Sequence, residues 1–230
     1  MKCQVCRALE PDELFSPGQS LASIIDATVL KATATDQDVI ALCETDTKHH
    51  TASVCINSHF LPLIRKHLHP DVKSCTVINF PLGSGSTAVI AAEAQAALDS
   101  GAQEVDMVQN LSALLSGNLD EAYAGINAAA KLCISRQALL KVILETCYLD
   151  DELIIISCLI AKKAGAKFVK TSTGFGSAGA TPEAISLMRK VVGPKFGVKA
   201  SGGIRNQEQA LQMVAAGANR IGASSVDALI

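Results

Sequence analysis

The sequence contains no tryptophan, and aromatic residues make up only 3% of it. Proteins that bind single-stranded nucleic acids stack the bases on aromatic side chains, so this mode of binding is excluded. Charge of one sign is not in excess either, because 20 basic residues stand against 22 acidic ones and the formal net charge is −2. A balanced surface gives no general attraction to nucleic acids or anionic membranes. We therefore expect no nucleic-acid or membrane partner, and any anionic ligand must be held locally.

Long apolar runs are also missing. No window approaches the roughly 18 apolar residues that span a bilayer, and residues 1–7 lack the apolar stretch of a secretory signal. We therefore expect a cytoplasmic location. The eight cysteines are scattered through apolar runs, which in such a chain predicts reduced thiols rather than disulfides. Cys3 and Cys6 form a CxxC pair, but no second CxxC or HxxxH follows, so no metal site is predicted.

The chain has the size and composition of one compact α/β domain. Its 230 residues are 49% hydrophobic and 18% charged, which allows one large core rather than several modules. Residues 1–20 contain Pro11, Pro17 and Gly18 and show little periodicity, so we interpret them as an N-terminal extension. The expected catalytic domain is 21–230.

From residue 20 onward the chain repeats one unit, in which a short β-branched run is followed by a turn and an amphipathic helical pattern. The predicted strands are 23–28, 52–57, 74–80, 104–109, 139–145, 167–172, 197–201 and 220–223. The predicted helices are 35–48, 58–68, 86–100, 118–133, 150–164, 181–192 and 206–216. The expected helix N-caps are Thr35, Ser86, Asp150, Thr181 and Asn206.

Eight strands with a helix in every gap predict parallel pairing through right-handed crossovers, and such units close into a (β/α)8 TIM barrel. An open doubly wound sheet is the alternative. No GxGxxG motif follows an early strand, which counts against that alternative. Gly-Ala pairs also recur before the fourth, sixth and eighth predicted strands, as expected of equivalent positions around a ring. The sequence therefore favours the barrel, as a single domain.

Two lysines, Lys170 and Lys199, each end a β-prone run and are followed by small residues and glycine. Such strand ends form the rim where α/β barrels keep their chemistry. Strand residues alternate between the barrel interior and the helix layer. This alternation directs Lys170 and Lys199 inward, together with Asp106 on an earlier strand. Asp26, Lys141 and Glu145 are further inward-facing residues by the same rule.

An enclosed pair of lysines favours amine chemistry. An ordinary lysine is neutral only about once in 2500 molecules at pH 7, which handicaps a nucleophilic step by roughly 4.6 kcal/mol. A second cation and exclusion from water favour the neutral amine, which is the effect we expect of Lys199 on Lys170. The alternative is that both lysines only pair with Asp106, Glu145 and bound anions.

Glycine-rich segments follow the last three predicted strands. Bare backbone amides in such segments can cradle a phosphate dianion, as in many TIM barrels. We therefore predict a phosphorylated substrate. The segments comprise Thr173, Gly174, Phe175 and Gly176; then Ser201, Gly202, Gly203 and Ile204; and then Gly222, Ala223, Ser224 and Ser225.

The motifs together resemble the deoxyribose-phosphate aldolase family from about residue 21 to the end of the chain. They are IDATVLK at 25–31, VCIN at 54–57, NFPLG at 79–83, EVDMV at 104–108, KVILET at 141–146, FVKTSTGF at 168–175 and VKASGGIR at 198–205. The two lysine motifs are highly specific when they occur in this order.

The resemblance implies a class I aldolase that interconverts 2-deoxy-D-ribose 5-phosphate with D-glyceraldehyde 3-phosphate and acetaldehyde, without metal or organic cofactor. It implies that Lys170 forms the Schiff base, that Lys199 perturbs it and that Asp106 relays protons. It also implies substrate-binding residues, which are Asp26, Thr28, Cys55, Thr173, Gly174, Gly202, Gly203, Gly222, Ser224 and Ser225. A homodimer or higher homo-oligomer is expected.

Two other functions remain open from the residues alone. Another Schiff-base barrel, such as a keto-acid aldolase or a transaldolase-like enzyme, would share an interior lysine. This alternative lacks support from an arginine placed to hold a substrate carboxylate. A catalytically silent phosphosugar-binding barrel would use Lys170 only as an anion ligand.

Overall fold

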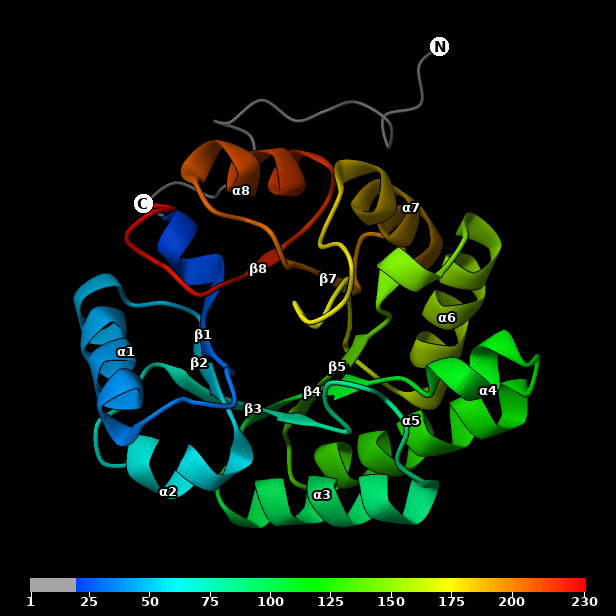
Figure 1. The fold of residues 1–230 in the computed structure, drawn as a ribbon, viewed down its shortest axis with the longest axis horizontal. Coiled ribbons are helices and arrows are strands. Elements are labelled where there is room, and N and C mark those ends of the chain that lie inside the picture. Colours follow the sequence, from blue (N-terminus) through cyan, green and yellow to red (C-terminus); the bar gives the residue numbers. More distant parts are fainter. Residues whose placement is uncertain (1–19) are drawn as a thin grey trace.

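The structure is a computed structural model that describes residues 20–230. Within this range eight parallel strands form a closed barrel in chain order, and the last strand pairs with the first (Figure 1). The strands are β1 (Ile25–Val29), β2 (Ser53–Ile56), β3 (Lys73–Ile78), β4 (Glu104–Val108), β5 (Leu139–Ile143), β6 (Phe168–Lys170), β7 (Gly197–Ser201) and β8 (Arg220–Ala223). The predicted (β/α)8 barrel is confirmed, and the doubly wound sheet is excluded.

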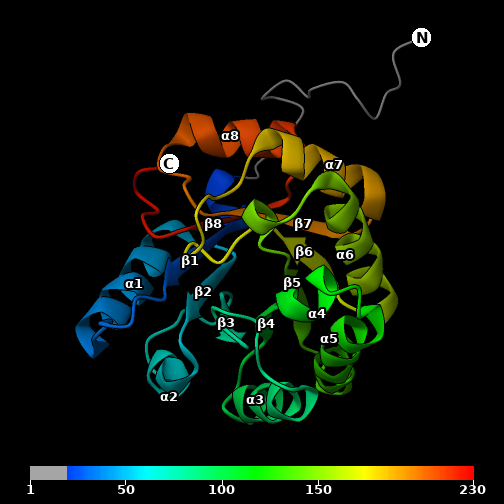
Figure 2. The ribbon, with the colours of Figure 1, turned by 45° about the vertical axis from the view of Figure 1, so that its right-hand side comes forward.

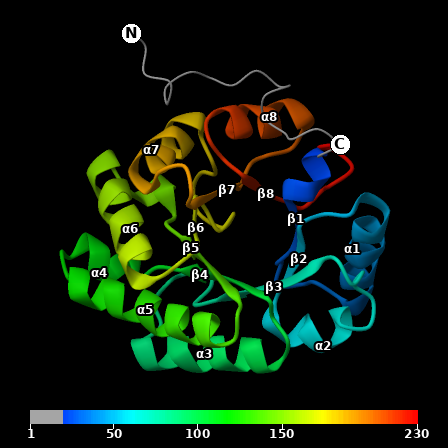
Figure 3. The ribbon, with the colours of Figure 1, turned by 180° about the vertical axis from the view of Figure 1, so that it is seen from behind.

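Helices surround the barrel on the outside, as the front and rear views show (Figures 1 and 3). They are α1 (Asp36–His49), α2 (Leu61–Ile64), α3 (Thr87–Asp99), α4 (Leu111–Leu115), α5 (Leu119–Ser135), α6 (Asp151–Ala164), α7 (Pro182–Val192) and α8 (Gln207–Ala215). Three 3-10 turns, Leu21–Ile24, Ser58–Phe60 and Thr146–Tyr148, complete the described elements. Figure 2 shows the strands enclosed between the helices in an oblique view.

Successive residues of a strand face either the apolar layer between strands and helices or the interior of the barrel. On β4, Val105 and Met107 are fully buried in the apolar cluster that the strands share with the helices. The neighbouring Asp106 is also fully buried, but it points into the barrel, where it meets charged side chains of other strands. The predicted facing of these residues is therefore confirmed.

Most predicted helix starts are confirmed by capping hydrogen bonds. The side chains of Thr35, Asp150, Thr181 and Asn206 each accept a backbone N–H of the first helical turn. Ser86 occupies the N-cap position of α3, as predicted, but its side chain makes no capping hydrogen bond within the described residues.

Two helix predictions need correction. The continuous helix expected over 58–68 is a 3-10 turn followed by the single turn of α2, which ends at Ile64. Pro70 disfavours a helical conformation at His69 and so limits extension of the helix. Helix α4, which Asn110 caps, is not among the helices predicted from the sequence. Five residues are too few to produce a recognisable helical periodicity.

The cysteines in the described part of the chain are free thiols, as predicted. They are Cys43, Cys55, Cys75, Cys133, Cys147 and Cys158. The predicted N-terminal extension and its CxxC pair fall mainly on residues 1–19, outside the described residues. No helix in 20–230 combines the length and apolar character that crossing a bilayer requires.

We expect Gly197→Ala to destabilise the barrel. Gly197 pairs with Phe168 across β6 and β7, and an added Cβ would lie 2.2 Å from the Phe168 ring. Overpacking of this kind typically costs about 1–3 kcal/mol. Urea unfolding should show a lower midpoint. The double variant Gly197→Ala/Phe168→Leu should recover part of the loss, and equal midpoints for wild type and Gly197→Ala would contradict the expectation.

Candidate active site

Asp106, in the middle of β4, is the centre of a group of lysines inside the barrel, of which only Lys170 lies at the carboxyl end of its strand. Its Oδ2 accepts hydrogen bonds from the Nζ atoms of Lys170 and Lys199, both at 2.8 Å. Its Oδ1 accepts from Nζ of Lys141, also at 2.8 Å. The strand register explains this convergence, because Lys141 lies opposite Asp106 and Lys170 lies opposite Lys199. The structure thus brings together the three residues that the sequence predicted to be catalytic.

A wider ion cluster, which consists of Asp26, Glu104, Asp106, Lys141, Lys170, Lys199 and Arg220, surrounds this centre. Lys141 lies 2.5 Å from Glu104, and Lys199 lies 2.5 Å from Asp26. Arg220, at the start of β8, bridges Asp26 at 2.6 Å and Glu104 at 3.2 Å. Four basic side chains therefore meet three carboxylates within the described residues.

Asp106 and Asp26 are stabilised as anions. Burial raises the pKa of Asp106, but Lys141, Lys170 and Lys199 outweigh burial and hold the pKa well below its ordinary value. Burial likewise opposes ionisation of Asp26, whose pKa is nevertheless lowered by Lys141, Lys199 and Arg220. Both carboxyl groups are therefore anionic near neutral pH in this arrangement.

Two of the lysines are stabilised as cations. Burial disfavours the charged form of Lys141, but Asp106 and Asp26 raise its pKa well above the ordinary value. The pKa of Lys199 is also raised, because the same two carboxylates outweigh burial. Both side chains are fully buried. The sequence analysis expected a cation beside Lys170, and the structure provides one in Lys199.

Lys170 differs from the other two lysines in its surroundings. Among residues 20–230 it pairs with a single carboxylate, Asp106, and it lines an open pocket. With all seven groups of the ion cluster ionised, cations exceed anions by one, and loss of one proton would balance the charges. Because Lys141 and Lys199 are each held by at least two carboxylates, Lys170 is the amine best placed to become a neutral nucleophile.

The pocket beside Lys170 has a volume of about 280 Å³ and lies at the carboxyl ends of β1, β6, β7 and β8. It is lined by residues from all three predicted phosphate-binding segments. The lining residues are Thr28, Leu30, Lys31, Lys170, Thr173, Gly174, Phe175, Ser201, Gly202, Gly203, Ile204, Gly222, Ala223 and Ser224. Seven of the ten predicted substrate-binding residues are in this set.

The remaining three predicted substrate-binding residues do not line the pocket. Asp26 and Cys55 are fully buried in the barrel interior, and Asp26 is engaged by Lys199, Arg220 and Ser53. Ser225 is exposed beside the lining residue Ser224. In this structure Asp26 supports the ion cluster, while no described contact links Ser225 to the pocket.

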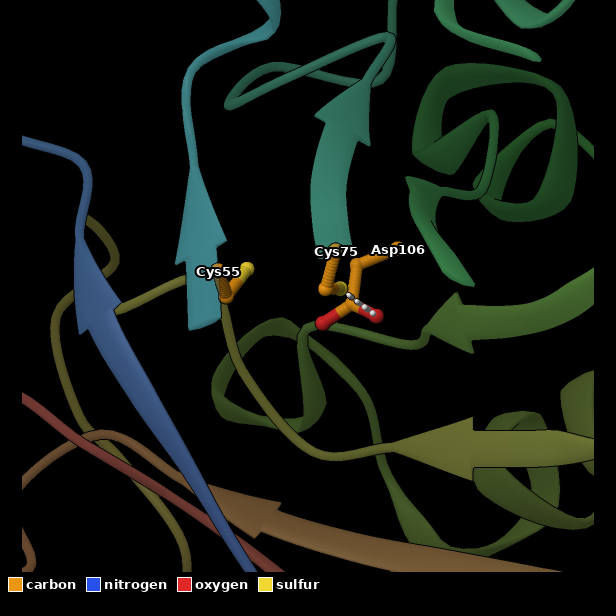
Figure 4. Close-up of side chains that lie close together, drawn as sticks. All are labelled: Cys55, Cys75 and Asp106. Carbon is orange, nitrogen blue, oxygen red and sulfur yellow. Dashed lines mark hydrogen bonds between the residues drawn. The ribbon is translucent and has the colours of Figure 1, made fainter. Parts of the chain in front are cut away.

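Cys55, Cys75 and Asp106 lie close together on β2, β3 and β4, with potential ligand atoms within 4.8 Å of one another (Figure 4). Cys75 Sγ donates to Asp106 Oδ1 at 3.4 Å. This group is a poor metal site, because both Asp106 oxygens already accept from ammonium groups. An added metal cation would also increase the positive excess of the ion cluster.

Hydrogen bonds and close packing hold the pocket loops in place. Thr173 donates its backbone N–H to Glu145 at 3.0 Å and its hydroxyl to the same carboxylate at 2.5 Å. The loop after β6 also packs directly on the loop after β7. A Cβ added at Gly179 would lie 2.0 Å from the carbonyl oxygen of Gly202. Only glycine allows this approach without displacing the backbone.

Sequence reasoning missed several members of the site. Glu104 lies two residues before Asp106 on the same strand and therefore also faces inward, so strand alternation alone could have identified it. Arg220 meets Asp26 only once β8 pairs with β1. Cys75 contacts Lys141 across the intervening strand β4. Lys31 is the last residue of the motif at 25–31 and was assigned no role, yet it lines the pocket.

Comparison with known proteins shows that the chain is similar to aldolases. Residues 20–228 match the model of the DeoC/LacD family aldolases. The chain is 50% identical over 211 residues to a deoxyribose-phosphate aldolase of Thermococcus gammatolerans, which covers 90% of this chain and 94% of the relative. A counterpart from Caldanaerobacter subterraneus is 51% identical over 208 residues, with 90% of each chain covered.

Solved structures agree with these matches. A tetrameric structure of deoxyribose phosphate aldolase from Aeropyrum pernix superposes with a TM-score of 0.83 at 36% identity. The match covers 91% of this chain and 88% of that chain. Both the barrel and a substantial part of the sequence are therefore shared with these enzymes.

We expect acid to weaken the fold through the carboxylates of the ion cluster. The folded-state pKa of Asp26 lies below the unfolded value near 3.9, so the unfolded chain takes up the proton first as pH falls. Stability is therefore present above about pH 4 and lost below it, by about 1 kcal/mol per pH unit from this one group.

Urea unfolding at pH 7, pH 4 and pH 3 measures this effect. Asp26→Asn should be less stable than wild type at pH 7, because it leaves buried cations partly unpaired. Between pH 4 and pH 3, however, the variant should lose less stability than wild type. Equal losses in the two proteins would show that Asp26 does not carry the predicted linkage.

Proposed function

The chain belongs to the DeoC/LacD family of aldolases, and we propose that it cleaves 2-deoxy-D-ribose 5-phosphate to D-glyceraldehyde 3-phosphate and acetaldehyde, reversibly, as a class I aldolase. The names of its relatives and their roughly 50% identity support this reaction. The observation that carries the proposal is the position of Lys170. Its amine belongs to an ion cluster that has one surplus positive charge, and Lys170 also lines a pocket that contains several glycines.

In the proposed reaction, the neutral amine of Lys170 attacks the aldehyde carbon C1 of the open-chain sugar. The carbinolamine loses water and becomes an iminium ion. When the C2–C3 bond breaks, its electron pair moves toward the iminium nitrogen and forms an enamine. The C3 hydroxyl loses its proton and becomes the aldehyde group of glyceraldehyde 3-phosphate. Protonation of the enamine at C2 and hydrolysis by water then release acetaldehyde and restore Lys170.

Asp106 and Lys199 are proposed to handle the protons. Asp106 is held as an anion whose Oδ2 faces both lysines, so it can accept a proton and pass it on. Lys199 is held as a cation, so it can donate a proton without first acquiring one. The two roles are complementary, and Oδ2 of Asp106 accepts hydrogen bonds from both Lys199 and Lys170.

The glycine-rich segments are proposed to bind the phosphate at the far end of the sugar. Gly174, Gly202 and Gly203 line the pocket that also contains Lys170, so one ligand can contact both. Fixing the phosphate directs C1 toward the amine, which converts remote binding energy into alignment. The keto-acid aldolase and the silent binding barrel lack a comparable combination of supporting observations.

We also propose that the protein forms a homo-oligomer in the cytoplasm. The tetrameric structure of the Aeropyrum pernix relative supports self-association. The free thiols of the described residues are typical of a reducing compartment.

Borohydride trapping tests the role of Lys170. With acetaldehyde present, reduction should leave an ethyl group on Lys170 that peptide mass spectrometry can assign. Lys170→Ala should give no adduct at this site and no activity in a coupled assay for glyceraldehyde 3-phosphate. Lys167→Ala is the matched control, because Lys167 precedes the same strand and is exposed. An unmodified Lys170 in active wild-type protein would overturn the assignment.

Asp106→Asn should lower kcat by roughly 100-fold or more, because general acid–base groups typically contribute about 10²–10⁴-fold. The neutral amide also removes a charge from beside Lys141, Lys170 and Lys199. Circular dichroism should establish that the variant is folded before the coupled assay is run. A folded variant whose kcat stays within about threefold of wild type would remove Asp106 from the proton relay.

A further inference from the structure

We propose that Lys31 binds the phosphate group of the substrate and so determines the preference for phosphorylated over unphosphorylated sugars. This inference rests on the proposed function. Lys31 follows β1 and lines the same pocket as Lys170 and the three glycine-rich segments. The sequence patterns predict no role for this residue.

The charge of the pocket wall motivates the proposal. Lys31 and Lys170 are the charged side chains among the described lining residues, and no carboxylate lies among them. A sugar phosphate carries about 1.5 to 2 negative charges near pH 7. Because Lys170 is committed to the carbonyl carbon at the other end of the substrate, Lys31 is the lining side chain left to neutralise the phosphate. Backbone amides alone would supply only partial charges.

The fold places Lys31 beside the expected phosphate position. β1 pairs with β8, so the chain that leaves β1 lies next to the segment Gly222–Ser224 that ends β8. Within residues 20–230, the backbone N–H groups of Gly203, Ile204 and Ser224 donate to no protein acceptor. These free donors and the Lys31 ammonium group border one pocket, and together they match the oxygens of a phosphate.

The present partner of Lys31 leaves it free to move. Its Nζ lies 3.1 Å from Asp38 Oδ1, and both side chains are at the surface. An exposed ion pair of this kind contributes little stability and is readily exchanged. Asp38 itself stays in place, because its Oδ2 accepts from the backbone and hydroxyl of Thr35 in the capping box of α1. Lys31 can therefore turn to a phosphate without disturbing the helix.

Steady-state kinetics of Lys31→Met tests the proposal. We expect KM for 2-deoxyribose 5-phosphate to rise roughly tenfold, with kcat within about twofold of wild type, since a charge-assisted hydrogen bond is lost only at the distant end. The kcat/KM for unphosphorylated 2-deoxyribose should not change. The Ki of inorganic phosphate as a competitive inhibitor should rise to a similar extent. Lys31→Arg should retain most of the preference.

Lys48→Met is the matched control. Lys48 is exposed on α1 and lies 3.1 Å from Asp227, so this variant removes a comparable surface ion pair away from the pocket. Its KM and Ki should equal the wild-type values. If Lys31→Met also leaves both quantities unchanged, the proposal is overturned.

Failure of the proposed function would give a different result. Wild-type protein would then not cleave 2-deoxyribose 5-phosphate at all. Calorimetric titration of inorganic phosphate into wild type and Lys31→Met would still decide whether Lys31 binds phosphate. Equal affinities would reject the role of Lys31 independently of the reaction.

Discussion

The site depends on electrostatic compensation among charges that are enclosed by the barrel. Isolated ions cannot be buried at tolerable cost, and removing one partner of a buried pair typically costs about 3–5 kcal/mol. Here each carboxylate of the ion cluster contacts at least two cations, so the closed ring of strands and the charges inside it require each other. The same contacts restrict the flexible side chain of Lys170 to one orientation, which aligns its amine with the pocket.

Residues of the ion cluster have different roles according to how deep they lie in the barrel. Glu104 and Arg220 lie toward the amino ends of their strands and contribute charge balance. Lys170 lies at the last position of β6, where the strand opens into the loops that line the pocket. Reactivity is thus located where the compensated interior meets solvent. The helices pack on the outside of the barrel and contribute no side chain to the ion cluster. In this fold the loops that shape the pocket can therefore vary while the barrel stays the same.

The sequence predicted most of the fold because each strand carries a strong local signal. All eight strands were identified, and parity alone oriented Asp106, Lys141 and Lys199 correctly. The partnership of Asp26 with Arg220 was not predictable, because it arises only when β8 closes on β1. Lys31 was missed for a similar reason, since its position at the pocket depends on two strands that are almost 200 residues apart in the chain. Local sequence patterns predict the strands and helices, whereas the closure of the barrel determines which side chains from distant strands come into contact.

The contact between the loops after β6 and β7 has a consequence for the evolution and engineering of this enzyme. Because the Gly179 backbone rests against Gly202, a residue other than glycine at position 179 requires a compensating shift in the loop after β7. A loop transplanted from another barrel after β6 would collide with the resident loop after β7 unless both were exchanged together. Attempts to broaden the aldehyde scope by recombination should therefore choose crossover points outside this paired unit.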